Sequence, residues 1–433
     1  MSSSQSSSCS FSLSAPQLQL PSLSRASIIA LPRRALRAAP RLLKQGITFP
    51  VRYARLRSLR AAYRRGSANA ARDLPHEDAD PVIVETGRSL RQELLTTNQG
   101  KHAAAGYRVL MLNPGSITAE IWFGGLQACM QHAGIDCLAL PPGTAGVAVT
   151  AAVEAFQPNV LIAAESTATL QSLDLQFIHD YKRRHACLRL FIPVWLAHAP
   201  GGASSRRQDA WRRRLRQKGL LADAHFSIFE PEFHDRFARD RLGPYTEYAT
   251  IAQSCNPFTD QPLAEAKQHD YFMATSLTDE RVEVTYRLLR PILASYRGLW
   301  AGRRWGFGRA NIPPGDMPLH YAQTRVALSP LVEFVSKFGA ELTLRVFAAA
   351  GCGSFQLTQP TPITARYFRP DELVQASSPE EYVRLFEHYV DRPAERNAVA
   401  LRALRRAYGE HTCFHRVDQL VHHLDSWRKR GLF

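Results

Sequence analysis

The stretch Phe338–Phe368, FGAELTLRVFAAAGCGSFQLTQPTPITARYF, decides the fold of this chain. Three apolar residues recur in it at helical spacing: Leu342, Val346 and Ala349. Other apolar residues extend this surface around most of the circumference, which predicts a buried helix. The helix is expected to open at Gly339 and to stop at Gly351, and a short strand should follow over Ser354–Thr358.

Polar residues at the start of this helix form the first candidate site. Glu341, Thr343 and Arg345 would lie in a buried first turn, where polar groups are costly unless they have partners. A helix start offers free backbone N–H groups and the positive end of the helix dipole, and both favour a phosphate. Arg345 would complete the neutralisation of a diphosphate. The alternative interpretation is an ordinary core helix capped by glycines.

Strands and helices alternate through the first half of the chain. Short apolar runs occur at residues 108–114, 135–141, 159–166 and 188–196, with helical segments between them. Continuous apolar strands in this arrangement predict a parallel sheet covered by helices on both faces. Ligands of such sheets bind at the carboxyl ends of the strands. The rule nominates four residues in the first half: Asn113, Gly115, Glu165 and His198.

The same alternation begins again at His269, after a linker that contains prolines. The predicted fold class is therefore α/β, with two Rossmann-like parallel-sheet domains that face each other across a cleft. The expected parts are a basic, mostly disordered arm with possible short helices (1–100), a first domain (101–255), a linker (256–268), a second domain (269–413) and a last helix that packs back toward the first domain (414–433).

Four pieces of the second half, taken in order, resemble one known family. They are HDYFMATSLTDERVEVTYRLLRPIL (269–293), LWAGRRWGFG (299–308), MPLHYAQTRVALSP (317–330) and ELTLRVFAAAGCGSFQLT (341–358), the last followed by RPDELVQASSPEEYVRLFEHYV and EHTCFHR. In this order they resemble the nucleotide-binding half of GT-B glycosyltransferases, with a C-terminal domain like that of glycosyltransferase group 1. The spore-maturation-protein type is the most similar. No single piece is specific, and their order carries the resemblance.

The resemblance implies a glycosyltransferase that moves a sugar from a nucleotide-diphosphate donor, its co-substrate, to a glycan, lipid-linked or protein acceptor. The second domain would hold the donor and the first domain the acceptor. We expect a metal-independent reaction without a cofactor, in which cations and helix-start N–H groups neutralise the diphosphate. The expected donor-binding residues are Ser276, Arg281, Arg303, Arg304, Gly339, Glu341, Thr343 and Arg345. Asn113 and Gly115 would form the acceptor-side loop, and His198 or Glu165 would be the catalytic base.

Ala348 departs from the family pattern. Members of the broader family usually carry a glutamate here, and in related enzymes that glutamate holds the ribose hydroxyls. Either another residue, with Glu341 as the candidate, makes this contact, or the activity is weakened or lost. Two alternative functions follow: a non-catalytic binding protein descended from such an enzyme, and a nucleotide-sugar epimerase. An epimerase would need clustered acid and base residues on the donor side, and the sequence shows no such cluster.

The positive charge of the chain is concentrated at its start. The net charge is +16, but residues 1–72 contain 13 Lys and Arg and no Asp or Glu, which leaves only +3 for the rest. A nucleic-acid-binding face on the folded part is therefore not implied. Residues 1–24 are uncharged and contain 11 serines. Together with the arginine-rich sequence that follows, they predict either an organellar transit peptide or the disordered basic tail of a cytoplasmic enzyme.

Val51–Arg65 within the arm predicts a basic amphipathic helix. Leu56, Leu59 and Tyr63 share one face, and arginines occupy a neighbouring face, so the helix could make peripheral contact with an anionic membrane. No run of 18 or more apolar residues occurs, and no transmembrane helix is expected. The seven cysteines are scattered and form no CxxC pair, which predicts reduced, buried thiols.

Overall fold

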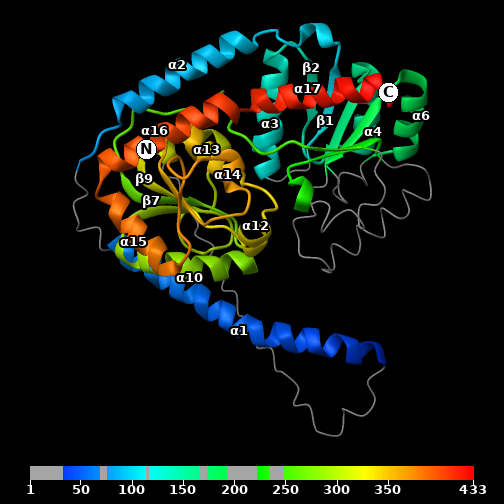
Figure 1. The fold of residues 1–433 in the computed structure, drawn as a ribbon. Helices are drawn as coiled ribbons and strands as arrows, with labels where there is room; N and C mark the ends of the chain where they lie inside the picture. Colours follow the sequence, from blue (N-terminus) through cyan, green and yellow to red (C-terminus); the bar gives the residue numbers. More distant parts are fainter. Residues whose placement is uncertain (1–32, 69–75, 114–116, 165–172, 193–221, 234–246) are drawn as a thin grey trace, which may run out of the picture. The chain divides into compact units, whose positions relative to one another are not determined.

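The computed structural model describes residues 33–68, 76–113, 117–164, 173–192, 222–233 and 247–433 (Figure 1). Residues 54–433 belong to one compact unit, and the chain before residue 54 belongs to another. The described part of that other unit is the first portion of helix α1, Arg33–Ala68. The functional site is built entirely within the compact unit.

The first domain of the compact unit is a parallel sheet. Its strands are β1 (Arg108–Leu112), β2 (Asp136–Leu140), β3 (Val160–Ala164), β4 (Leu188–Ile192), β5 (Ala224–Ser227) and β6 (Tyr248–Thr250), paired in the order β2-β1-β3-β4-β5-β6. Helices α3 (Ile117–His132), α4 (Gly146–Phe156) and α6 (Leu175–His185) accompany them. One apolar core contains Val109 and Met111 of β1, and the other contains Leu110 and Leu112. Alternate residues of one strand thus enter different cores, as expected for a sheet buried on both faces.

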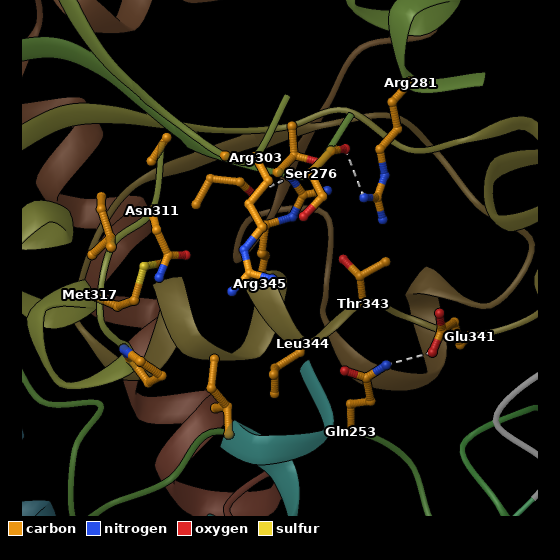
Figure 2. Close-up of a pocket in the computed structure, with 17 residues that line it drawn as sticks. Gln253, Ser276, Arg281, Arg303, Asn311, Met317, Glu341, Thr343, Leu344 and Arg345 are labelled. Carbon is orange, nitrogen blue, oxygen red and sulfur yellow. Dashed lines mark hydrogen bonds between the residues drawn. The ribbon is translucent and has the colours of Figure 1, made fainter. Parts of the chain in front are cut away.

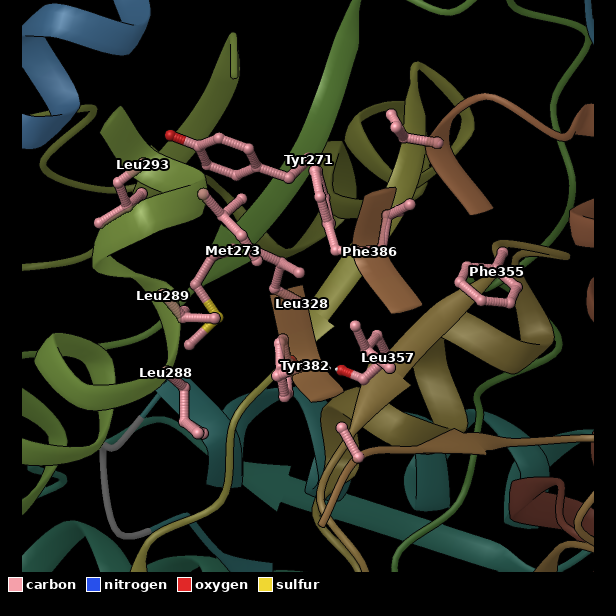
Figure 3. Close-up of a cluster of buried hydrophobic side chains, with 14 of the residues drawn as sticks. Tyr271, Met273, Leu288, Leu289, Leu293, Leu328, Phe355, Leu357, Tyr382 and Phe386 are labelled. Carbon is pink, nitrogen blue, oxygen red and sulfur yellow. Dashed lines mark hydrogen bonds between the residues drawn. The ribbon is translucent and has the colours of Figure 1, made fainter. Parts of the chain in front are cut away.

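The second domain repeats this design with five parallel strands. They are β7 (His269–Ala274), β8 (Gly298–Ala301), β9 (Thr324–Ser329), β10 (Gln356–Thr358) and β11 (Val374–Gln375), paired in the order β11-β10-β9-β7-β8. Their helices are α10 (Asp279–Ser295), α11 (Met317–Ala322), α12 (Glu333–Phe338), α13 (Leu344–Gly351), α14 (Thr364–Tyr367), α15 (Pro379–Val390) and α16 (Pro393–Glu410). Figure 3 shows Leu288 and Leu289 of α10 with Tyr382 and Phe386 of α15 in one core of this sheet. The predicted fold class, two parallel-sheet domains, is confirmed.

Two buried chain segments cross between the domains side by side. Cys255, on the way into the second domain, pairs with Thr412, on the way out, in an isolated parallel bridge. The Cys255 N–H donates to the His411 carbonyl at 3.0 Å, and the Cys413 N–H donates to the Cys255 carbonyl at 2.8 Å. The returning chain forms the last helix, α17 (Cys413–Lys429), which packs against α3 (Figure 1). Its apolar residues belong to the first domain's core.

The arm predicted for residues 1–100 is shorter than expected, because its last part is ordered. Helix α2, Pro81–Asn98, begins at the N-cap Asp80 and packs against α16 (Figure 1). Just before it, Glu77 forms ion pairs with the buried Arg325 and Arg396. These ion pairs connect the segment that precedes α2 to the second domain.

The apolar face of the predicted amphipathic helix is covered by the protein itself. Leu59 is fully buried in the second domain's core, and Leu56 and Tyr63 pack against that core. The Arg60 Nε donates to the Trp305 carbonyl at 2.9 Å. The prediction that this face contacts a membrane is therefore corrected: its apolar residues pack inside the compact unit.

Two further expectations concern membranes and thiols. None of the helices in the described ranges has the length and hydropathy that crossing a membrane would require. The six cysteines in these ranges are buried and not in disulfides, as predicted.

Candidate active site

A cavity of about 220 Å3 lies beyond the ends of β7 and β8, between the two domains (Figure 2). The loops after β7 and β8 and the start of α13 form its wall on the second domain. The first domain contributes Ile121 of α3 and Gln253, which follows β6. Three arginines line this space, and we call it the arginine cavity: Arg281, Arg303 and Arg345.

Arg345 lies at the point where the strand order of the second sheet reverses, between β7 and β9. Its guanidinium donates to the carbonyl of Ala274 at the end of β7, at 3.0 Å, and to that of Pro330 just after β9, at 3.3 Å. In open parallel sheets this reversal is the usual place for a ligand. Within the described ranges, no carboxylate lies within ion-pair distance of Arg345. Burial, aided by the charge of Arg281, lowers the pKa of Arg345 to about 10, so it is still cationic at neutral pH.

Thr343 is the N-cap residue of α13, but its side chain makes no capping hydrogen bond. Its backbone has the extended conformation of an N-cap, and its hydroxyl is buried without a hydrogen-bond partner in the described part of the molecule. A buried hydroxyl without a partner is costly. The unused donor and the N–H groups of the helix start therefore offer hydrogen bonds to an anion in the cavity.

Arg281 and Arg303 add positive charge around the same space. Arg281 lies in the first turn of α10, where its Nη1 donates to the Ser276 carbonyl at 3.0 Å. Burial lowers the pKa of Arg281, and the nearby Glu341 opposes this effect. Arg303 follows β8. With three arginines and one carboxylate, the described lining carries a net positive charge, which favours an anionic ligand.

Glu341 is held from the opposite domain. It accepts a hydrogen bond from the Nε2 of Gln253, whereas the amide oxygen of Gln253 is buried without a partner in the described ranges. Burial raises the pKa of Glu341 to about 7, against the effects of the Gln253 hydrogen bond and the charge of Arg281. Figure 2 shows Glu341 and Gln253 at one end of the cavity and Asn311 and Met317 at the other.

A second cavity, of about 360 Å3, adjoins the arginine cavity and has mainly apolar walls. We call it the apolar cavity. Five residues line both spaces: Ile121, Pro314, Met317, Leu344 and Arg345. Small residues of α3 and α13, Gly124, Gly125 and Ala348, face the apolar cavity, and Asp260 of the linker lines it as well. Burial raises the pKa of Asp260 to about 6.

Six of the predicted donor-binding residues line the arginine cavity: Ser276, Arg281, Arg303, Glu341, Thr343 and Arg345. Arg304 and Gly339 do not line it; Gly339 ends α12. Asn113 follows β1 and lines neither cavity. The other acceptor-side residue and both predicted bases, Gly115, Glu165 and His198, lie outside the described residues. The roles of all these residues stay predictions.

The continuous helix predicted from Gly339 to Gly351 is wrong. Gly339 takes the left-handed conformation, with φ of 62°, and ends α12, and α13 starts only at Leu344. Glu341 therefore lies in the loop between them, not in a first helical turn. The loop is tied to the first domain, because the Glu230 N–H donates to the Ala340 carbonyl at 3.0 Å.

The lining residues that the sequence did not predict include Ile121, Gln253, Asn311 and Met317. Gln253 lies in the segment ATIAQSCNPF, 249–258, which leads into the linker. A loop residue such as Gln253 belongs to no periodic pattern in the sequence. It lines the cavity only because the tertiary fold brings this loop to the space between the domains.

Comparison with known proteins agrees with this geometry. The family model described as glycosyl transferase-like matches residues 281–422. Sucrose-phosphate synthase from Thermosynechococcus elongatus has a similar structure, with a TM-score of 0.53 and 10% identity, covering 74% of this chain and 99% of that chain. A mutant of the T4 phage beta-glucosyltransferase in complex with UDP-glucose has a TM-score of 0.52 and 12% identity, covering 74% of this chain and 99% of that chain. No curated protein matches the sequence.

The protein thus has the fold of a GT-B glycosyltransferase. More particularly, residues 281–422 are similar to the family model described as glycosyl transferase-like. This matched segment contains all three arginines of the arginine cavity. The predicted relationship to GT-B glycosyltransferases is confirmed, and the nearer resemblance to spore-maturation proteins stays a prediction.

Proposed function

We propose that the protein transfers a sugar from a nucleoside-diphosphate donor to a hydroxyl acceptor, with the diphosphate bound in the arginine cavity. The observation that carries this proposal is Arg345 at the strand reversal, without a carboxylate partner in the described ranges, beside the unpartnered hydroxyl of Thr343. A diphosphate would provide the negative charge that Arg345 lacks and a hydrogen-bond acceptor for the Thr343 hydroxyl.

The same groups support the chemistry of transfer. When the bond between the sugar and the diphosphate breaks, negative charge develops on the leaving oxygen. Arg345 is fixed by two backbone carbonyls, so little reorganisation is needed to stabilise that charge. Arg281 and Arg303 supply further positive charge from separate elements. We propose that these groups neutralise the leaving group without a metal ion.

Uridine diphosphate is the first nucleotide to test. The phage enzyme of similar fold is described in complex with UDP-glucose. Isothermal titration calorimetry with UDP and GDP should show binding to the wild-type protein. The variant Arg345→Gln keeps a polar side chain but removes the charge, and we expect roughly 100-fold weaker binding from the loss of charge-assisted hydrogen bonds.

Arg287→Gln is the matched control, because it removes the same charge from an exposed residue of α10 outside the cavity. Its affinity for the nucleotide should stay within about threefold of the wild type. Equal losses in the two variants, or no binding of either nucleotide to the wild type, would contradict the proposal. Product analysis with a panel of sugar nucleotides then distinguishes transfer from epimerisation.

A second candidate function is nucleotide binding without catalysis. Ala348 favours it, because this residue lines the apolar cavity where the broader family carries a glutamate. The two functions differ in one measurement. A protein that binds a nucleoside diphosphate but consumes no sugar nucleotide from the panel is a binding protein.

A further inference from the structure

Glu341 is the single carboxylate among the described residues that line the arginine cavity. It lies at the end of the cavity next to the first domain, where Gln253 reaches across from the other side (Figure 2). Thr343 and Arg345, the proposed diphosphate ligands, follow it in the chain after two and four residues. A carboxylate so close to a phosphate site weakens anion binding by repulsion, so its presence there calls for another role.

Gln253 fixes the orientation of this carboxylate. Its amide N–H donates to Oε2 of Glu341, which leaves Oε1 without a partner in the described ranges. The amide oxygen of Gln253 is buried and also unpartnered there. One free carboxylate oxygen and one free amide oxygen therefore lie close together, and both can accept hydrogen bonds from hydroxyl groups.

We propose that Glu341 is the catalytic base of the transfer, a role that rests on the proposed function. Oε1 of Glu341 takes the proton of the acceptor hydroxyl. The acceptor oxygen forms a bond to the anomeric carbon, and the bond between that carbon and the diphosphate oxygen breaks. The electron pair leaves with the diphosphate, which Arg345 and Arg281 stabilise. A single displacement of this kind inverts the configuration at the anomeric carbon.

The surroundings of Glu341 suit proton transfer at neutral pH. The charged group that faces it is Arg281 of α10, and the neutral Gln253 faces it from the first domain. Burial has the largest effect and raises the pKa of Glu341 to about 7. A base whose pKa lies near the working pH is present in its ionised form and is still basic enough to accept a proton.

The test compares Glu341→Gln with Glu387→Gln, a matched control on the exposed side of α15. The assay is consumption of the sugar nucleotide that the panel identifies, and UDP binding is measured in parallel. We expect Glu341→Gln to lower kcat roughly 100- to 10,000-fold, the usual effect of losing a general base. UDP should bind this variant as tightly as the wild type or more tightly, and Glu387→Gln should change neither quantity.

The pH profile provides a readout that a structural role would not change. Ionised Glu341 is the active form, so wild-type kcat/KM should rise with pH through a midpoint near 7 and then level off. Glu341→Gln should lack this rise. Gln253→Leu removes a hydrogen bond that lowers the pKa of Glu341, so the rise should move to higher pH. This second variant tests the role even if Glu341→Gln does not fold.

Several results would overturn the inference while leaving the proposed function intact. They are a kcat of Glu341→Gln within about fivefold of the wild type, a pH profile unchanged in both variants, or retention of the anomeric configuration in the product. Much weaker UDP binding by Glu341→Gln, with kcat unchanged, would instead make Glu341 a donor ligand. Absence of nucleotide binding or turnover in the wild type would overturn both the inference and the proposed function.

Discussion

The hydroxyl of Thr343 makes no hydrogen bond within the described part of the protein, and it is available to a ligand. An N-cap threonine normally accepts a hydrogen bond from the first turn of its helix, which stabilises the helix by about 1 kcal/mol. Thr343 has the backbone conformation of a cap but makes no such bond. Its hydroxyl is buried next to Arg345, in the space that we assign to the diphosphate.

Replacement of Thr343 by valine, which has the same shape, should therefore affect stability and binding in opposite directions. Removal of the unpartnered hydroxyl should leave the free energy of unfolding unchanged or raise it by up to about 1 kcal/mol. UDP affinity should fall roughly 10- to 100-fold, because a hydrogen bond to a charged oxygen is worth about 1.5–3 kcal/mol. Urea unfolding and calorimetry measure the two effects.

Thr358→Val provides the control. The Thr358 hydroxyl is buried and donates to the Ser329 carbonyl at 2.8 Å, outside both cavities. This variant should lose about 1 kcal/mol of stability and keep its UDP affinity. A stability loss in Thr343→Val as large as in the control would show that the Thr343 hydroxyl has a partner inside the protein.

Among single residues, the sequence predicts Thr343 and Arg345 near the start of α13. It does not predict the residues from other parts of the chain that lie beside them. Arg345 and Thr343 belong to a helical pattern that is visible in the chain. Gln253 lies 88 residues before Glu341, in a loop without periodicity. Its place beside Glu341 depends on the fold of both domains, so local sequence carries no signal for it.

At the scale of elements, the last part of α1 is a helix whose apolar face docks on the second domain. Leu59 is buried in the core. The Tyr63 hydroxyl donates to the Gly298 carbonyl at 3.3 Å, and the Arg60 Nε donates to the Trp305 carbonyl. The amphipathic pattern predicts the helix correctly. It cannot say whether a protein surface or a membrane covers the apolar face, because both take the same side chains.

Leu59→Glu should release this helix from the domain, because it would bury an unpaired charge. Trypsin should then cleave after Arg60 and Arg64 at least tenfold faster than in the wild type, as expected for a locally unfolded segment. Mass spectrometry of the early fragments measures this rate. Arg57→Glu, an exposed change on the same helix, should leave cleavage at these two sites unchanged.

Helix α13 shows where a periodic pattern fails. The apolar spacing continues backward from Val346 to Leu342, but Gly339 stops the preceding helix in the left-handed conformation, and the chain is extended at Thr343. Apolar spacing alone does not show such an interruption. Gly351, which the sequence presents as a helix stop, is also required by packing, because a Cβ there would lie 2.8 Å from the Cβ of Cys255.

At the scale of the whole molecule, an ionic clasp joins the two domains beside the site. Arg366 of α14 forms ion pairs with Glu230 at 2.8 Å and with Glu232 at 2.6 Å. Tyr367 donates its hydroxyl to Glu230 as well. Glu230 is buried and Glu232 is exposed, so the two pairs should differ in energy.

Arg366→Ala should lower the free energy of unfolding by about 1–2 kcal/mol, because the buried carboxylate of Glu230 loses a half-exposed cation but keeps the Tyr367 hydroxyl. The double variant Glu230→Gln and Arg366→Ala should recover part of this loss. Glu232→Gln should cost less than about 1 kcal/mol. Denaturant unfolding measures these three variants and the single variant Glu230→Gln. An equal cost for Glu230→Gln and Glu232→Gln would show that both ion pairs behave as exposed surface pairs.

The position of the last helix, α17, limits how the two domains can be exchanged in a chimeric protein. Residues 413–429 are encoded after the whole second domain, yet their apolar side chains complete the core of the first. A gene cut once at the linker would therefore yield two incomplete pieces. A chimera that exchanges only the second domain must therefore be joined at two points, one near Cys255 and one near Thr412. Helix α17 then stays with the first domain whose core it completes.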